Sequence, residues 1–152
     1  MDALYQKHIL SLAHNARAST LDFSPSQSAT CNNPVCGDKV HVSIAIKADH
    51  VANISVDVKG CALCEAGAGL LLECAHNAHI NETLALSAQL KAFLSSEADH
   101  NHPTADDKID KFEVFAPVKE ISNRHKCVLL AFQAFNEAVS LFRADGDLVK
   151  SP

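Results

Sequence analysis

The amino-acid sequence predicts a single α+β domain, in which an N-terminal helix, a small antiparallel sheet of about three strands and several C-terminal helices follow one another. Two runs of alternating apolar and polar residues between positions 40 and 59 predict paired strands, and the segments on either side have apolar residues at helical spacing. No linker or internal repeat divides the 152 residues, which suffice for one hydrophobic core. We therefore expect one domain over residues 1–152.

Composition and charge restrict the partners and the compartment. The chain has 47% hydrophobic and 20% charged residues, as globular proteins do, and a net charge of -5. This balance offers no cationic surface for nucleic acid or an anionic membrane, so neither partner is expected. No apolar run is long enough to cross a bilayer and no signal peptide is evident, which predicts a cytoplasmic protein. In that reducing compartment, cysteines more often bind metals or catalyse reactions than form disulfides.

The first predicted helix runs from Asp2 to about Arg17 and should dock onto the rest of the domain. Its apolar residues recur at roughly helical spacing: Leu4, Ile9, Leu12 and Ala13. The following segment, LDFSPSQSATCNNP, is dense in Ser, Pro and Asn, which is typical of a loop that could include one short strand.

An antiparallel hairpin is predicted next. Each of two strands has apolar residues at every second position, and the polar stretch KADH separates the strands. The apolar residues are Val40, Val42, Ile44 and Ile46 in the first strand and Ala52, Ile54, Val56 and Val58 in the second. We expect His41 on the solvent face and His50 in the turn, with neither acting as a ligand.

Helices follow the hairpin. One is predicted from Ala62 to about Ala75, and a second is predicted to begin at Asn81, because asparagine is a good N-cap. The polar segment EADHNHPTADD should be an exposed loop, in which His100 and His102 are solvated rather than bound to metal.

The C-terminal part is predicted to be helical as well. Residues 108–121 are apolar enough for a short helix that Pro117 interrupts. The last helix should extend from Ser122 to Gly146, and the tail of about residues 147–152 should be frayed.

Three of the six cysteines are predicted at the ends of elements. Cys36 lies in the loop that enters the first hairpin strand, whereas Cys61 and Cys127 lie near helix starts, where the helix dipole favours the thiolate. Asp38 follows Cys36 by two residues, and Gly37 between them allows a sharp turn. Three thiolates and one carboxylate would suit tetrahedral zinc or the edge of a small iron–sulfur cluster.

Several stretches resemble the iron–sulfur cluster assembly scaffolds of the NifU, IscU and SufU type. They are LYQKHIL, NNPVCGDKV, GCALCEAGAGLLLE and RHKCVLLAFQA, in this order over most of the chain. The long segment between Cys61 and Cys127, with its polar insert, and Lys126 before the last cysteine are most similar to the SufU branch. The resemblance implies a SufE/NifU-like fold.

The resemblance also implies a site and an activity. Cys36, Asp38, Cys61 and Cys127 match the family positions that bind zinc in SufU-like members and a transient [2Fe-2S] cluster in IscU-like members. The implied protein is a scaffold or sulfur-transfer partner rather than a stand-alone enzyme. It would accept persulfide sulfur from a cysteine desulfurase and support downstream apo iron–sulfur proteins.

Individual roles follow from the same resemblance. Asp38 would be the labile ligand, and Cys36 or Cys127 would be released to accept sulfur. Arg124 matches a basic position before the last cysteine and would contact the partner or a sulfur anion.

Two departures from the family pattern leave alternatives open. Gly67 and Gly69 replace the usual serines, which lowers helix propensity by about 1 kcal/mol each or permits close helix–sheet packing. Cys64, one turn after Cys61, is either a small buried residue or an extra metal ligand or sulfur-accepting partner. The remaining cysteines are expected to have no function, with Cys31 in a loop and Cys74 in the core.

Two rival functions also fit parts of the sequence. A thioredoxin-like dithiol protein would use Cys61 and Cys64, because CALC follows a strand and opens a helix. The preceding antiparallel hairpin, in place of a βαβ unit, argues against it. A structural zinc module is the other rival, which binding to a desulfurase would exclude.

Overall fold

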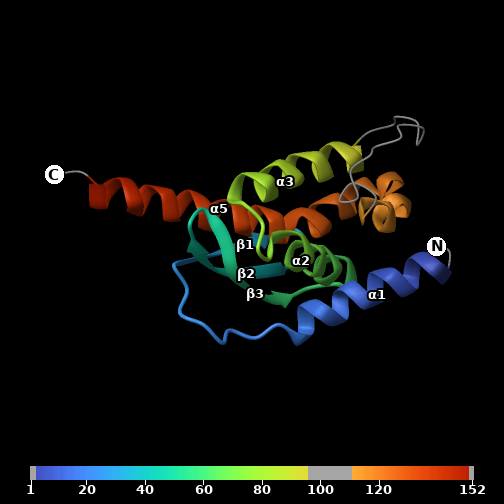
Figure 1. Ribbon diagram of the computed structural model, residues 1–152. Coiled ribbons are helices and arrows are strands. Elements are labelled where there is room, and N and C mark those ends of the chain that lie inside the picture. The colour runs from blue at the N-terminus through green and yellow to red at the C-terminus, as the bar shows by residue number, and fades with distance from the viewer. Residues whose placement is uncertain (1–2, 96–110, 151–152) are drawn as a thin grey trace.

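The chain folds around a three-stranded antiparallel sheet of order β1-β2-β3 (Figure 1). The structure, a computed structural model, describes residues 3–95 and 111–150, with side chains as far as residue 145. The elements are helix α1 Ala3–Ala18, strands β1 Gln27–Asn33, β2 Asp38–Lys47 and β3 His50–Lys59, helices α2 Ala62–Ala75 and α3 Ile80–Ser95, the 3-10 helices η1 Lys111–Glu120 and η2 Ser122–Arg124, and helix α5 His125–Lys150. The predicted α+β class and its order of elements are confirmed.

The predicted hairpin is formed by β2 and β3. Its two-residue turn consists of Ala48 and Asp49, both with positive φ (52° and 62°), which is the conformation that tight hairpins favour. One face of β2 is fully buried: Val40, Val42 and Ile44. Strand β1 occupies the segment expected to be mainly loop, and it pairs with β2 as far as Asn33 opposite Asp38. The end of the sheet therefore presents the turn with Cys36.

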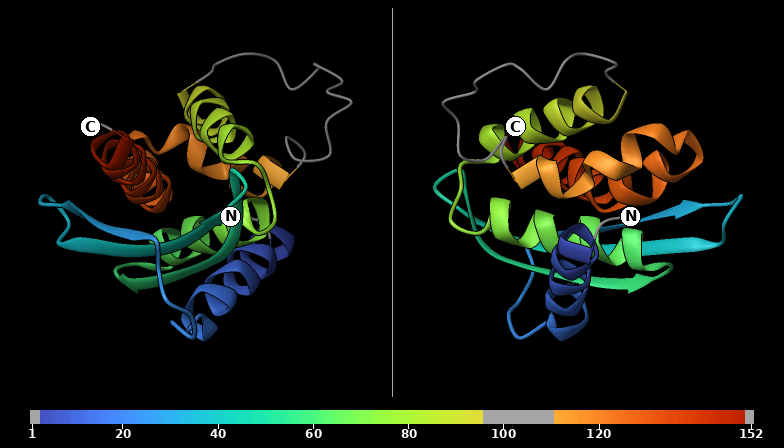
Figure 2. Two further views of the ribbon diagram at one scale, coloured as in Figure 1. Left: turned by 60° about the vertical axis from the view of Figure 1, so that its left-hand side comes forward. Right: turned by 90° about the vertical axis from the view of Figure 1, so that its right-hand side faces the viewer.

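Helices α2 and α5 cover one face of the sheet, α1 packs against α2, and α3 lies along α5 (Figure 2). The largest fully buried side chains come mainly from these helices and from η1: Leu70, Leu71, Leu90, Phe112, Phe115, Phe132 and Phe135. On the other face of the sheet, His41 and Asp57 are paired across β2 and β3, and the end of α1 and the segment after it lie against this face.

Two glycines let α2 touch its neighbours through the backbone. A Cβ on Gly67 would lie 2.1 Å from the carbonyl oxygen of Val128 in α5, and one on Gly69 would lie 2.0 Å from that of Leu12 in α1. The close packing anticipated for these glycines therefore exists, but its partners are two helices rather than the sheet. It brings the start of α5, with Cys127, against α2.

Several sequence-based details are wrong. Leu4 is 58% exposed, and α1 is instead buried through Ile9, Leu12, Ala13 and Ala16. Helix α3 begins at Ile80 rather than at an Asn81 cap, because His79 Nδ1 accepts the Asn81 N–H at 3.0 Å and supplies the cap.

The C-terminal elements also differ from expectation. Pro117 lies inside η1 and does not interrupt it. Helix α5 continues past Gly146 to Lys150. The histidines of the predicted polar loop, His100 and His102, and the last two residues lie outside the described residues.

One helix is apolar enough to meet a criterion that no segment was expected to meet. Ser122–Asp145 meets the length and composition of a membrane-crossing helix, and 50% of its most apolar window is buried inside the protein. The core helix of a soluble protein meets the same criterion, so this is weak evidence for a membrane.

Candidate metal centre

The turn between β1 and β2 is organised by Asn33. Its Nδ2 donates to Cys36 Sγ at 3.4 Å, its Oδ1 accepts the Val35 N–H at 3.2 Å, and its carbonyl accepts the Gly37 N–H at 2.8 Å. Gly37 has a φ of +76°, a conformation that glycine adopts without strain. The turn leaves Cys36 exposed at the end of the sheet.

Asn33 was given no role in the sequence analysis. The sequence did offer a signal for this role, because an asparagine side chain can accept a hydrogen bond from the backbone N–H two residues later, as in an Asx turn. Asn33 is only 6% exposed, and its two side-chain bonds hold the Cys36 turn in place.

Asp38, the first residue of β2, is buried beside this turn. It is 5% exposed, and it is hydrogen-bonded to Cys127. A Cβ on Gly60 would lie 2.8 Å from Asp38 Oδ1, so the carboxylate packs against bare backbone there. Its other oxygen, Oδ2, is buried without a hydrogen-bond partner among the described residues. An unpaired buried carboxylate oxygen is costly, and a metal ion would satisfy it.

The structure brings three of the four predicted ligands close together. The ligand atoms of Cys36, Asp38 and Cys127 all lie within 4.8 Å of one another. Cys61 falls outside this tight set but is hydrogen-bonded to Cys127. It is the N-cap residue of α2, and its side chain makes no capping hydrogen bond. The turn, the start of β2 and the start of α5 therefore bring two sulfurs and one carboxylate together, and the start of α2 places Cys61 beside Cys127.

The protonation of Cys127 depends on its surroundings. Burial raises the pKa of Cys127, and its hydrogen bond with Asp38 and the neighbouring Cys61 raise it further, whereas a hydrogen bond from Arg124 lowers it. That bond, followed by the charge of Cys61, raises the pKa of Arg124. In the protein without metal, Cys127 is therefore a neutral thiol, with the exposed guanidinium of Arg124 beside it.

Cys64 lies in the core. It is 0% exposed, and burial, followed by the charges of Asp38 and Cys61, raises its pKa to about 12. It does not belong to the tight ligand set, so its position agrees with the interpretation as a small buried residue. Cys74 is likewise buried, and Cys31 is part of strand β1 rather than a loop.

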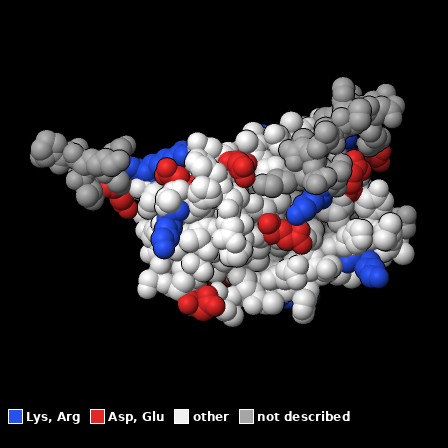
Figure 3. All heavy atoms as spheres, viewed as in Figure 1, with Lys and Arg blue, Asp and Glu red and all other residues white. Residues whose placement is uncertain are grey.

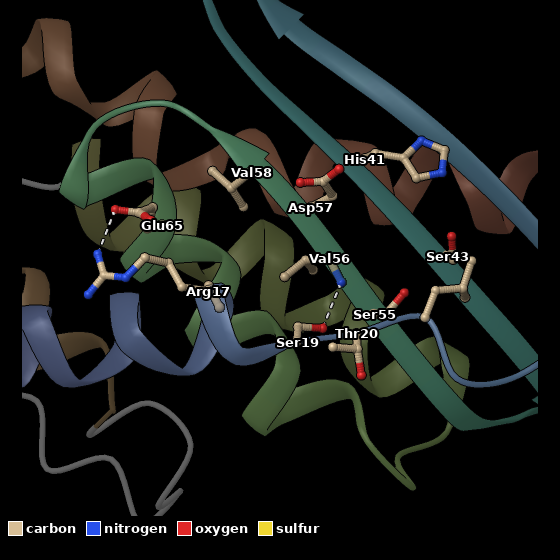
Figure 4. A pocket seen from close by; sticks show the side chains of 12 residues that line it. Arg17, Ser19, Thr20, His41, Ser43, Ser55, Val56, Asp57, Val58 and Glu65 are labelled. Atoms are coloured by element: carbon tan, nitrogen blue, oxygen red, sulfur yellow. Dashed lines mark hydrogen bonds and ion pairs between the residues drawn. The ribbon is translucent and has the colours of Figure 1, made fainter.

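A cavity of about 480 Å³ lies apart from this centre, between the end of α1 and strand β3 (Figure 4). None of the four predicted ligands lines it. Within it, Arg17 forms an ion pair with Glu65 at 3.1 Å, and Ser19 Oγ accepts the Val56 N–H at 3.1 Å. The ion pair ties the end of α1 to the first turn of α2, next to Cys61.

Comparison with known proteins relates the whole arrangement to one family. Residues 4–111 match the sequence model of the family described as the NifU-like N terminal domain. The zinc-dependent sulfurtransferase SufU of Bacillus subtilis (strain 168) is 24% identical over 142 residues, which cover 92% of each chain. The iron–sulfur cluster assembly scaffold protein IscU of Streptococcus pyogenes serotype M1 is 25% identical over 108 residues, which cover 71% of this chain and 65% of the relative.

Solved structures show the same fold. The N-terminal part of a NifU-like protein from Brucella abortus has a TM-score of 0.77 at 24% identity, covering 92% of this chain and 94% of the other. A putative iron–sulfur cluster assembly scaffold for the SUF system from Fervidobacterium islandicum AW-1 has a TM-score of 0.71 at 20% identity, covering 87% and 93%.

Proposed function

Because its residues 4–111 match the family model, this chain belongs to the NifU-like N-terminal domain family of iron–sulfur cluster assembly scaffolds, and we propose that it accepts persulfide sulfur from a cysteine desulfurase at a zinc site. Its similarity to a zinc-dependent sulfurtransferase extends over 92% of the chain. The observation that best supports the proposal is the meeting of Cys36, Asp38 and Cys127 within 4.8 Å.

The residues present fit zinc. Cys36, Asp38, Cys61 and Cys127 would hold it, because thiolates and a carboxylate are ordinary zinc ligands and four ligands complete a tetrahedron. The buried Oδ2 of Asp38 would gain the partner it lacks among the described residues. Bound zinc would keep the cysteine sulfurs deprotonated.

Exposure distinguishes the two predicted sulfur acceptors. Cys36 is exposed on its turn, whereas Cys127 is 0% exposed in helix α5. A desulfurase persulfide can therefore reach Cys36 without any opening of the core, and we assign the acceptor role to Cys36. Cys61 and Cys127 would stay in place and keep the centre together.

The transfer needs no external oxidant. The Cys36 thiolate attacks the outer sulfur of the enzyme persulfide, and a new S–S bond forms at Cys36. The S–S bond of the enzyme breaks, and its electron pair leaves with the enzyme's own cysteine as a thiolate. Arg124, which is exposed and faces Cys127, Cys61 and Cys36, would attract the incoming sulfur anion or the partner.

A second cargo suits the same residues. The IscU relative is a cluster assembly scaffold, and three thiolates with a carboxylate could also hold a transient [2Fe-2S] cluster as cargo for downstream apo iron–sulfur proteins. We propose that either reaction takes place in the cytoplasm, where thiols are kept reduced.

The rival functions have less support. The strand before CALC belongs to an antiparallel sheet, so the βαβ setting of a thioredoxin-like dithiol site is missing among the described residues. A structural zinc module would be expected to enclose its ligands, whereas Cys36 is exposed.

The proposal is tested with a purified cysteine desulfurase from the same organism, free cysteine and this protein. We expect the protein to increase alanine release and to gain the mass of one sulfur atom on Cys36. Cys36→Ser should abolish both effects, whereas Cys31→Ser, in strand β1, should preserve them. If the protein leaves alanine release unchanged and gains no sulfur, the proposed function is wrong.

A further inference from the structure

Polar side chains line one wall of the cavity between the end of α1 and strand β3. Ser43 of β2 and Ser55 of β3 are register partners, and His41 and Asp57 form the next pair on the same face of the sheet. All four line the cavity, and Figure 4 shows them along the two strands. Its volume of about 480 Å³ is in the usual range of small-molecule sites.

The two serine hydroxyls of this wall lack a protein partner. Ser43 is 2% exposed and Ser55 is 5% exposed. Neither hydroxyl forms a hydrogen bond within the part of the chain that the structure describes, whereas Ser19 Oγ in the same cavity accepts the Val56 N–H at 3.1 Å. A buried hydroxyl without a partner costs free energy. A ligand in the cavity would supply the missing partner to both serines.

The charge of the cavity that lacks a partner among the described residues is negative. Three charged side chains line the cavity: Arg17, Glu65 and Asp57. Arg17 and Glu65 form an ion pair at 3.1 Å, so their charges balance. Asp57 forms no ion pair or hydrogen bond within the described residues, although Lys59 leaves the same face of the sheet two positions later. The cavity should therefore attract a cation and repel an anion.

Three hydrogen-bond acceptors lie at neighbouring positions of the two strands: Ser43, Ser55 and Asp57. Directly opposed side chains have Cβ atoms about 4.5–5.5 Å apart, and the next residue on the same face follows about 7 Å along the strand. The longer side chain of Asp57 spans part of that distance. A primary ammonium group has three N–H donors and bonds oxygen at about 2.7–3.2 Å. One ammonium group can therefore bond all three side chains.

We propose that this cavity binds a small aliphatic primary amine, whose ammonium group pairs with Asp57 and donates to Ser43 and Ser55. The rest of the ligand would lie toward Thr20 and Leu21 of the segment after α1, which add a hydroxyl and an apolar side chain to the lining. Polyamines, amino alcohols and amino acids share the ammonium group. The site is separate from sulfur transfer, because none of the proposed metal ligands lines the cavity.

The test must separate binding in the cavity from a general attraction of cations to a protein of net charge -5. Acidic and basic side chains are interspersed on the face shown in Figure 3, so that face presents no single large acidic surface. The probes are ethanolamine, putrescine and L-alanine. Choline is the control, since it is ethanolamine with a positive charge but no N–H donor. The readout is the NMR shift of backbone amides in β2 and β3, at about 0.15 M salt, where the screening length is about 8 Å.

Four variants assign the contacts. Asp57→Asn removes the unpaired charge and keeps the size of the side chain, and Ser43→Ala/Ser55→Ala removes both hydroxyls. Asp49→Asn is the matched control, because Asp49 is exposed in the hairpin turn and asparagine tolerates its positive φ. Lys59→Gln removes the nearby cation and so tests the sign of the charge that attracts the ligand.

We expect ethanolamine to shift the amides of the cavity residues and choline to bind at least about tenfold more weakly. Asp57→Asn and the double serine variant should each raise the half-saturating ethanolamine concentration about tenfold, as for loss of a hydrogen bond to a charged group. The unfolding temperature of the double serine variant should be unchanged or higher. Asp49→Asn and Lys59→Gln should match the unmodified protein. Tighter binding of putrescine would identify a polyamine, tighter binding of L-alanine an amino acid, and neither an amino alcohol.

Equal binding of ethanolamine and choline would overturn the inference, because charge alone would then explain it. Equal affinities of Asp57→Asn and Asp49→Asn would also overturn it, as would the absence of shifts at the cavity with all three amines. A lower unfolding temperature of the double serine variant would assign the hydroxyls to the fold instead. These titrations contain no desulfurase, so a negative result leaves the proposed function standing.

Discussion

Replacing Gly67 by alanine should damage the metal centre from the core of the protein. The new Cβ would lie 2.1 Å from the Val128 carbonyl oxygen, and real Cβ contacts essentially never fall below 3.0 Å, so α2 and α5 must separate by at least 3.0 − 2.1 = 0.9 Å. Val128 directly follows Cys127, whereas metal–ligand distances tolerate only about 0.2 Å. The change should therefore move Cys127 away from Cys61 and Asp38.

The magnitude follows from two opposing effects. Overpacking a core costs about 1–3 kcal/mol, and a backbone oxygen cannot rotate away, so the upper end applies here. Alanine regains about 1 kcal/mol of helix propensity. The free energy of unfolding should thus fall by about 2 kcal/mol, which lowers the unfolding temperature by about 4–8 °C in a domain of this size.

Thermal unfolding and zinc titration of Gly67→Ala measure the two consequences. Zinc affinity should fall about 10- to 100-fold, the range typical for loss of outer support around a metal. Ala66→Gly in the same turn of α2 is the control, since it lowers stability without adding a Cβ and should leave zinc affinity unchanged. Adding Val128→Ala should not rescue Gly67→Ala, because the obstacle is a main-chain atom. Unchanged stability and zinc affinity in Gly67→Ala would refute this reasoning.

The remaining predictions concern the centre itself. Asp38→Ala should slow the release of zinc or a cluster to a chelator while the protein stays folded, since Asp38 is the labile ligand; exchange at the normal rate would contradict its assignment. Asn33→Ala should lower the free energy of unfolding by about 1–2 kcal/mol and accelerate alkylation of Cys36, because the turn loses two side-chain hydrogen bonds. Alkylation as slow as in the exposed-site control Asn32→Ala would refute that role. Zinc affinity should decrease as pH falls from about 8 to about 6, because burial keeps the pKa of Cys127 raised and zinc must displace the thiol proton. The decrease should be about tenfold per pH unit for each thiol that must lose a proton. Competition with a chelator across this range would show it, and an affinity independent of pH would contradict thiolate ligation.

The sequence identified the elements whose signals are local. The alternation from Val40 to Val58 predicted the hairpin, and apolar spacing predicted α2 at its observed bounds, Ala62–Ala75. Strand β1 was less evident, because QSATCNN has little apolar alternation and is stabilised by its pairing with β2. Similarly, the His79 cap depends on a side-chain position that composition does not reveal.

The sequence pattern indicated candidate ligands, but their meeting at one site was predictable only through the resemblance to a family. Cys36, Cys61 and Cys127 could be placed at element ends, but nothing local required Cys127 to approach Asp38 across 89 positions of the sequence (127 − 38). The structure shows how this happens: Gly67 lets α5 approach α2, and Gly60 makes room for the Asp38 carboxylate. The contribution of Asn33 also required the three-dimensional arrangement.

X-ray absorption at the zinc edge, on protein purified without oxygen, tests the central claim most directly. If Cys36, Asp38, Cys61 and Cys127 hold zinc, the spectrum should show three sulfurs at about 2.3 Å and one oxygen at about 2.0–2.2 Å. Asp38→Ala should lose that protein oxygen and keep the sulfurs. A shell of four sulfurs, a shell of nitrogen ligands, or purified protein that contains no zinc would contradict the account.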